Sequence, residues 1–107
     1  MGGLLETPMR RFRTFDNYLH SELKDPKHAA LYLNAVLEEN DRELLMVALA
    51  DVARAHGLTK VAKRTHISRM GLYKMLSKHK NPGLKTFLAI LEAAGITIHF
   101  QPRALAA

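Results

Sequence analysis

Apolar positions among residues 26–38 recur three or four residues apart, which is the spacing of one face of a helix. Asp25 precedes them and can cap the free backbone N–H groups of a helix, while Pro26 is tolerated at the first helical position. The pattern therefore predicts a helix over Pro26–Glu38. The apolar residues that carry it are Ala29, Ala30, Leu33, Val36 and Leu37.

The next apolar repeat predicts a second helix over Asp41–Ala55. Asn40, with Glu43 three residues later, resembles a capping box at its start. Gly57 is a natural stop after its end. The expected inward face of this helix is formed by Leu44, Leu45, Ala48, Leu49 and Val52.

Three more helices are predicted in the second half of the chain. Thr59 is placed to cap a short one over Lys60–Thr65, and Ser68 is placed to cap another over Arg69–Ser77. The sequence "KNPG" then breaks the helical pattern. A fifth helix follows and ends at Gly95, and its apolar lining is Leu84, Phe87, Leu88 and Leu91.

The segment Ile96–Phe100 alternates apolar and polar residues, which is the period of a half-buried β-strand. A single strand cannot satisfy its own backbone hydrogen-bonding groups, so it needs a partner. That partner is either the N-terminal segment or the same strand of a second copy, and the second arrangement makes a two-fold dimer. The candidate dimerisation residues are then Ile96, Ile98 and Phe100.

Together these elements predict an all-α fold, with five helices and a short C-terminal β-strand, in one domain over residues 25–101. Residues 1–24 show no readable repeat and are expected to be mostly irregular, and residues 102–107 are expected to form a C-terminal tail. The length of 107 residues and a hydrophobic content of 48% suit one globular domain with a small core.

Several classes of protein are disfavoured by composition. Cysteine is absent, which excludes a disulfide scaffold and thiolate metal sites and suits a reducing cytosol. No apolar run approaches the roughly 18 residues of a membrane span, and no apolar stretch follows the N-terminal arginines as in a secretory signal. The six histidines form no i, i+4 pair with a carboxylate that would complete a metal site. We therefore expect a cytoplasmic protein without a cofactor or a membrane partner.

Charge is distributed unevenly along the chain. Residues 1–50 contain six Lys/Arg and eight Asp/Glu, whereas residues 51–107 contain ten and two, and the whole chain carries +6 at pH 7. No acidic residue occurs from Val52 to Leu91, where nine Lys/Arg residues fall. This asymmetry favours a polyanionic partner, although a solvated basic face is a plainer alternative.

The most informative segment is "VAKRTHISRMGLYKML", from Val61 to Leu76. Its apolar residues are spaced to hold two short helices together across a tight turn, as in a helix-turn-helix over residues 59–77. His66 falls in the turn, where the backbone becomes left-handed and glycine is usual. Gly71, inside the second helix, either permits close approach to a DNA backbone or is tolerated at a cost of about 1 kcal/mol.

The exposed front of the second helix is the face that such a motif inserts into a major groove. Arginine can bind guanine O6 and N7 with two hydrogen bonds, and methionine or tyrosine can contact a thymine methyl group. Residues at the start of the first helix and after the second are placed to contact phosphates. The candidate DNA-binding residues are Thr59, Lys60, Ser68, Arg69, Met70, Tyr73, Lys74, Lys78 and Lys80.

The stretch Asp51–Gln101 resembles the Cro/repressor-type helix-turn-helix family. More narrowly, Tyr32–Phe100 resembles the addiction-module antidote proteins, the HigA-like antitoxins, chiefly in "ARAHGLTKVAK", "SRMGLYKMLS" and "NPGLKTFLAILEAAG". The short first helix "LTKVAK" and the preceding "YLNAVLEENDRE" favour that branch. The resemblance implies a small helical homodimer that binds its own operator DNA and neutralises a RelE-like toxin, an mRNA-cleaving ribonuclease.

Other function classes find less support in the residues. An enzyme is disfavoured because the chain has no cysteine nucleophile, no glycine-rich phosphate loop and no evident acid pair. RNA binding is disfavoured because exposed aromatics for stacking on bases are scarce. Two hypotheses remain, a stand-alone repressor and an antitoxin. They differ in the acidic N-terminal half, which either faces a basic toxin or consists of ordinary acids at helix starts.

Overall fold

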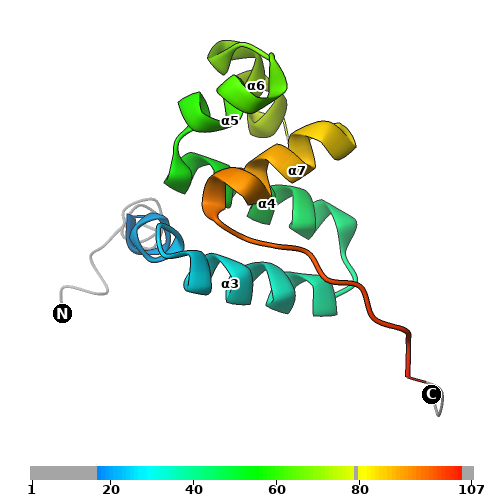
Figure 1. Ribbon diagram of the computed structural model, residues 1–107. Coiled ribbons are helices and arrows are strands. Elements are labelled where there is room, and N and C mark those ends of the chain that lie inside the picture. Colours follow the sequence, from blue (N-terminus) through cyan, green and yellow to red (C-terminus); the bar gives the residue numbers. More distant parts are fainter. Residues whose placement is uncertain (1–16, 79, 105–107) are drawn as a thin grey trace, which may run out of the picture.

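The fold is built from α-helices (Figure 1). A computed structural model describes residues 17–78 and 80–104. Residues 17–23 are helical. Five further helices follow in the described ranges, and these are α3 (Pro26–Glu38), α4 (Arg42–His56), α5 (Leu58–Thr65), α6 (Arg69–Ser77) and α7 (Gly83–Ala94). None of the helices in these described ranges is long and apolar enough to cross a membrane.

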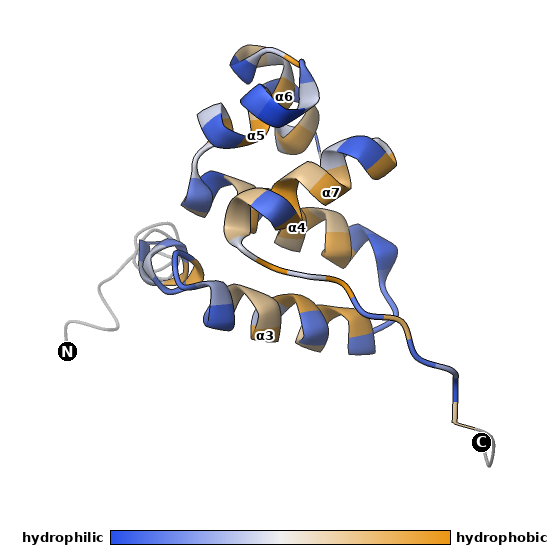
Figure 2. Cartoon of the chain, in the orientation of Figure 1, coloured by the Kyte–Doolittle hydropathy of each residue, from blue (hydrophilic) through white to orange (hydrophobic). Residues whose placement is uncertain are grey.

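Helix α4 lies at the centre of the molecule. It contacts α3, α5, α6 and α7, and α5 in turn packs against α6 and α7. Four alanines of α4 are buried, and their small side chains allow the neighbouring helices to approach closely. The core also contains Leu23, Val52, Val61, Leu72 and Ile90, each at most 1% exposed. Apolar residues accordingly face the space between the helices (Figure 2).

The predicted helix over Pro26–Glu38 is confirmed, including its start. Asp25 is the N-cap and its Oδ1 accepts a hydrogen bond of 2.9 Å from the backbone N–H of Lys27. Gly57 ends α4 with φ 97°, and Gly95 ends α7 in the left-handed conformation. Both glycines therefore occupy positions where a Cβ atom would be strained.

The capping box at Asn40 is wrong. Asp41 is the N-cap of α4, and its Oδ1 accepts a hydrogen bond of 3.1 Å from the backbone N–H of Leu44. Asn40 instead has φ 57°, a left-handed conformation that reverses the chain after α3 and does not suit an N-cap. The helix consequently covers Arg42–His56, one residue later at both ends than predicted.

The cap predicted at Thr59 is also wrong. Helix α5 begins at Leu58, so Thr59 lies inside its first turn, and Gly57 serves as the N-cap without a side-chain hydrogen bond. The same glycine ends α4, since its N–H donates to the carbonyl of Ala53. One residue with unusual backbone freedom thus joins two helices, and burial of Leu58 fixes the start of the second.

The predicted strand Ile96–Phe100 is not formed in the described residues. The Ile96 N–H donates to the Leu91 carbonyl, but no backbone hydrogen bond joins residues 97–104 to the part of the chain that the structure describes. A strand needs a paired neighbour, and residues 17–78 and 80–104 supply none there. The five-helix count is likewise incomplete, because residues 17–23 are helical and not irregular. The rest of the predicted irregular segment, residues 1–16, lies outside the described ranges.

Helical periodicity also overestimated burial at several leucines. Leu44, Leu84 and Leu88 were expected to face the core, yet they are 37%, 71% and 42% exposed. Phe87 is only half-buried, whereas Leu91 is buried as expected. The apolar repeat of α7 therefore includes positions that the described residues leave partly uncovered.

Candidate nucleic-acid interface

Helices α5 and α6 form a compact unit at one end of the molecule (Figure 1). Val61 of α5 and Leu72 and Leu76 of α6 are buried, and Ile67 between the helices is half-buried against the core. These contacts hold the two helices to each other and to α4 and α7. The predicted apolar contacts of this segment are therefore formed, and we call residues 58–77 the α5–α6 unit.

The turn between α5 and α6 is stabilised by Thr65. Its buried hydroxyl donates to the Ala62 carbonyl at 3.3 Å and accepts from the Ile67 N–H at 3.2 Å. His66 is left-handed, with φ 62° and ψ 15°, which confirms the turn position assigned to it. The role of Thr65 was not predicted, although a threonine directly before a left-handed residue is a signal that could have indicated it.

Ser68 caps α6 as predicted. Its Oγ accepts a hydrogen bond of 3.0 Å from the backbone N–H of Gly71. A Cβ atom on residue 71 would lie 3.1 Å from that Oγ and 3.2 Å from Cγ2 of Ile67, which is a crowded position. Glycine at 71 therefore leaves room for the Ser68 cap and for Ile67. The sequence had suggested either close approach to a DNA backbone or a tolerated cost, and neither interpretation included this packing.

The start of α6 presents four candidate DNA-binding side chains to solvent. Met70 and Tyr73 are 59% and 51% exposed, and Arg69 and Lys74 are also exposed. Tyr73 thus does not bury its ring on a neighbouring helix. Because residues 69, 70, 73 and 74 are three to four positions apart, they share one face of α6. The structure exposes these residues together on α6, whereas Leu72 and Leu76 are buried.

The remaining candidates flank this face. Thr59 and Lys60 are exposed in the first turn of α5, and Lys78 and Lys80 are exposed after the end of α6. Ser68 is exposed as well, but its hydroxyl oxygen already accepts the capping hydrogen bond. All nine candidates therefore lie on or beside the α5–α6 unit, at positions where an extended ligand can reach them.

The basic side chains of this surface lack acidic partners within the described chain. Arg64 of α5, which is not one of the candidate residues, does form an ion pair. Its Nε lies 3.1 Å from Glu92 Oε1, and both side chains are exposed. Lys60, Arg69 and Lys74 make no ion pair with a described residue. Their charges are available to an anionic ligand, and phosphate groups are the natural counterpart of such a surface.

Comparison with known proteins places the whole unit inside a recognised family. Residues 11–102 match the sequence model of a family described as "Probable addiction module antidote protein". This chain belongs to that family. A relative from Haemophilus influenzae, described as "Uncharacterized protein", is 36% identical over 91 residues, which span 85% of this chain and 92% of the relative. No solved structure matches the chain.

Membership of the antidote family implies a toxin of some kind as partner. The acidic residues of the N-terminal half are the other charged surface of the molecule, and α3 separates them into two groups. Glu22 and Asp25 lie near its start, where His28 Nδ1 is 3.1 Å from Glu22 Oε1. The second group is exposed where α3 meets α4, a region we call the α3–α4 corner, and it consists of Glu38, Glu39, Asp41 and Glu43.

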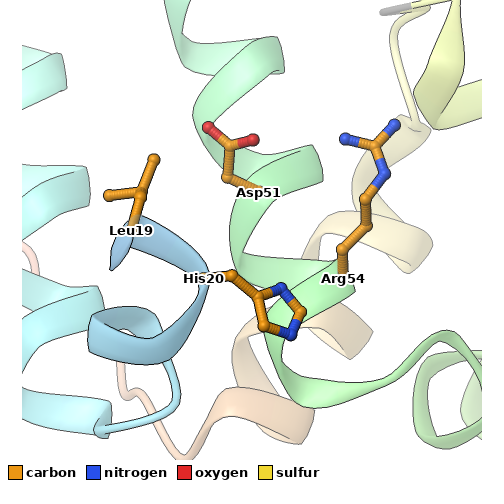
Figure 3. Close-up of a pocket in the computed structure, with 4 residues that line it drawn as sticks. All are labelled: Leu19, His20, Asp51 and Arg54. Atoms are coloured by element: carbon orange, nitrogen blue, oxygen red, sulfur yellow. The ribbon is translucent and has the colours of Figure 1, made fainter. Parts of the chain in front are cut away.

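A small hollow of about 180 Å³ lies between residues 17–23 and α4 of the antidote-family fold. Leu19 and His20 line it from the helical residues 17–23, and Asp51 and Arg54 line it from α4 (Figure 3). The Tyr32 hydroxyl donates to Asp51 Oδ2 at 2.8 Å. Burial, together with this hydrogen bond and the negative charge of Asp51, raises the pKa of Tyr32 well above its usual value.

These polar contacts bind the N-terminal helices to α4. His56 Nε2 lies 2.7 Å from the carbonyl oxygen of Leu23, so a protonated Nε2 donates a hydrogen bond that holds residues 17–23 against the end of α4. Neither His56 nor the pair of Tyr32 and Asp51 was predicted from sequence, because such pairs join residues far apart in the chain. Among the described residues, no group of three or more His, Cys, Asp or Glu is arranged to hold a metal ion.

Proposed function

We propose that this member of the antidote family is the antitoxin of a type II toxin–antitoxin system. It neutralises a RelE-like toxin that cleaves mRNA, and as a homodimer it binds its own operator DNA through the α5–α6 unit as an autorepressor. The unit then acts as a helix-turn-helix of the Cro/repressor type. Because the proposed toxin cleaves mRNA and the proposed operator is DNA, we propose that the protein acts in the cytoplasm.

The observation that carries the DNA-binding proposal is the exposed face of α6. It joins Arg69, Tyr73 and Lys74, which have no acidic partner in the described chain, on a helix whose start is fixed by the Ser68 cap. A recognition helix needs this combination, because its N-terminal residues contact base edges while the flanking residues position it on phosphates. Thr59, Lys60, Lys78 and Lys80 are the proposed phosphate contacts.

The toxin-binding proposal rests on family membership and on charge. An RNA-cleaving toxin needs a basic surface for its substrate, and the α3–α4 corner offers exposed Glu38, Glu39 and Glu43. Asp41 in the same corner is already used as an N-cap, as is Asp25 near the start of α3. The acids at helix starts are thus partly explained by capping, and the three glutamates are the stronger candidates for a basic partner.

The experiment that tests the antitoxin proposal is co-expression of the chain with the product of the adjacent open reading frame. We expect the neighbour alone to arrest growth, and co-expression to restore growth and yield a complex that co-purifies. The Arg69→Ala variant is the matched control, since it should bind the operator more weakly and still restore growth. A harmless neighbour that forms no complex would contradict the antitoxin proposal and leave a stand-alone repressor.

Substitution of Lys60 tests the proposed phosphate contacts. Lys60→Ala should weaken binding to the chain's own promoter and to random DNA alike, and should lower the slope of log K against log salt concentration by about one. Titrations at several salt concentrations measure that slope. Lys27→Ala removes an equally exposed lysine from α3 and should leave the slope unchanged. An unchanged slope for Lys60→Ala would remove this residue from the interface.

A further inference from the structure

Half of the large apolar side chains that are exposed in the described residues line one groove, and these are Leu37, Leu84, Leu88, Ile98 and Phe100. Helices α3, α4 and α7 enclose it together with the C-terminal segment, and its volume is about 730 Å³. Among its lining residues, Leu37, Leu84 and Leu88 are 57%, 71% and 42% exposed. Leu84 and Leu88, which the helical repeat wrongly placed in the core, therefore line this groove.

The C-terminal segment that borders the groove is extended, and its residues 97–100 make no backbone hydrogen bond with another described residue. It runs from the end of α7 past α3 and then away from the helices (Figure 1). Ile96, Ile98 and Phe100 all line the groove, and Phe100 is nevertheless 96% exposed. The chain thus carries an apolar groove and, beside it, an unpaired segment that ends in a fully exposed aromatic residue.

We infer that a second copy of this chain occupies the groove. Residues 96–100 of the two copies pair as antiparallel strands about a two-fold axis at Ile98, which supplies the backbone partners that each segment lacks alone. In this register, residue 96 of one copy lies opposite residue 100 of the other, on the same face of the ribbon. Because Ile96 lines the groove, Phe100 of each copy is brought to the groove of its partner.

The exposed area is sufficient for such a contact. Leu37, Leu84, Leu88, Ile98 and Phe100 together expose on the order of 500 Å² per copy, if a large side chain offers roughly 150–250 Å². A two-fold contact that covered these residues completely would bury about 1,000 Å² in total, which reaches the lower limit for a specific interface. The same residues on both copies form this contact, as two-fold symmetry requires.

A segment of the toxin fits the groove less well. No acidic residue lines it, so it offers no complement to a basic partner, whereas the α3–α4 corner does. The inference extends the proposed homodimer by naming the surface and register of its interface. It also leaves the α3–α4 corner and the α5–α6 unit free for the two proposed ligands.

Two leucines of α3 provide a matched test by sedimentation velocity of the chain alone. Leu37 lines the groove and is 57% exposed, and Leu31 on the same helix is 59% exposed and does not line it. We expect Leu37→Glu to weaken dimerisation at least tenfold, because a carboxylate would be buried among apolar side chains, and Leu31→Glu to leave it unchanged. Ile98→Asp, at the two-fold axis, should act like Leu37→Glu. A monomeric parent chain, or equal effects of the two leucine variants, would overturn the inference.

Crosslinking tests the register directly, because the natural chain has no cysteine. Opposed residues in an antiparallel pair have Cα atoms about 4.5–5.5 Å apart, a separation that a disulfide spans. Ile98→Cys should therefore form a disulfide-linked dimer rapidly on mild oxidation. Gln101→Cys should not, since its two copies would lie about 20 Å apart along the ribbon. Equal crosslinking of both variants would reject this register.

The inference rests on the homodimer of the proposed function. Neither measurement involves the toxin or DNA, so its outcome is independent of the proposed toxin binding and DNA binding. A dimer with the expected variant effects that fails to bind its promoter would reject DNA binding and retain this interface. If Leu37→Glu instead leaves the dimer intact and abolishes co-purification with the toxin, the groove belongs to the toxin and the inference is overturned.

Discussion

Replacing Leu72 by alanine should lower the free energy of unfolding by about 2–5 kcal/mol, which is the range for truncating a fully buried leucine. Leu72 is 0% exposed and is the residue of α6 that lies deepest in the core. It joins α6 to the rest of the fold, whereas Arg69, Tyr73 and Lys74 of the same helix are exposed. Loss of its side chain should therefore loosen the whole candidate DNA-binding face as well as the core.

Urea unfolding followed by circular dichroism would measure this loss, with Leu31→Ala as the control. Leu31 is 59% exposed on α3, so its truncation should change the free energy of unfolding by less than about 0.5 kcal/mol. Both variants must be compared at one protein concentration, because a dimer is stabilised by mass action. A loss for Leu72→Ala as small as that of the control would mean that α6 is not packed on the core as described.

Features that depend on neighbouring residues were predicted well from sequence. The cap at Asp25, the left-handed turn at His66 and the cap at Ser68 each involve a hydrogen bond or backbone conformation within three residues. The caps at Asn40 and Thr59 were wrong for a related reason. Asp41 competes with Asn40 one position away, and α5 begins directly after Gly57 because Leu58 is buried. Sequence alone does not weigh one capping residue against a neighbour.

Features that depend on distant residues were predicted poorly. The alternation at Ile96–Phe100 marks an extended segment correctly, yet a strand requires a partner that the described chain does not contain. Similarly, the helical repeat at Leu84 and Leu88 identifies an apolar face without showing whether anything covers it. The contact of Tyr32 with Asp51 joins residues 19 positions apart and leaves no local pattern.

The exposure of residues along α6 was easier to predict than the packing around this helix, whereas their role in DNA binding stays a prediction. A recognition helix is a short contiguous segment, so its exposed face follows from the 3.6-residue period and the position of one cap. Sequence therefore placed Arg69, Met70, Tyr73 and Lys74 on one face, which the structure bears out. What it missed was the support beneath that face, namely the Thr65 hydroxyl and the crowding around residue 71 that glycine relieves.

Replacing Arg69 by alanine should weaken binding to the cognate operator by about 1–3 kcal/mol, the value of one good bidentate contact with a base. Arg69 is exposed at the first position of α6, and the N-terminal residues of a recognition helix contact base edges. Binding to random DNA should fall much less, because that binding depends on phosphates. Competition titrations with single-base operator variants would show whether preference at one position is relaxed.

Arg69→Lys separates a base contact from a phosphate contact. Lysine keeps the charge but lacks the planar fork of donors that binds guanine O6 and N7 together. If Arg69 reads a base, Arg69→Lys should lose preference at the same position as Arg69→Ala while keeping most affinity for random DNA. If Arg69→Lys keeps its affinity for both the operator and random DNA, Arg69 contacts phosphate. The base contacts must then be made by Met70, Tyr73 and Lys74. Equal losses on operator and random DNA for Arg69→Ala would point to the same conclusion.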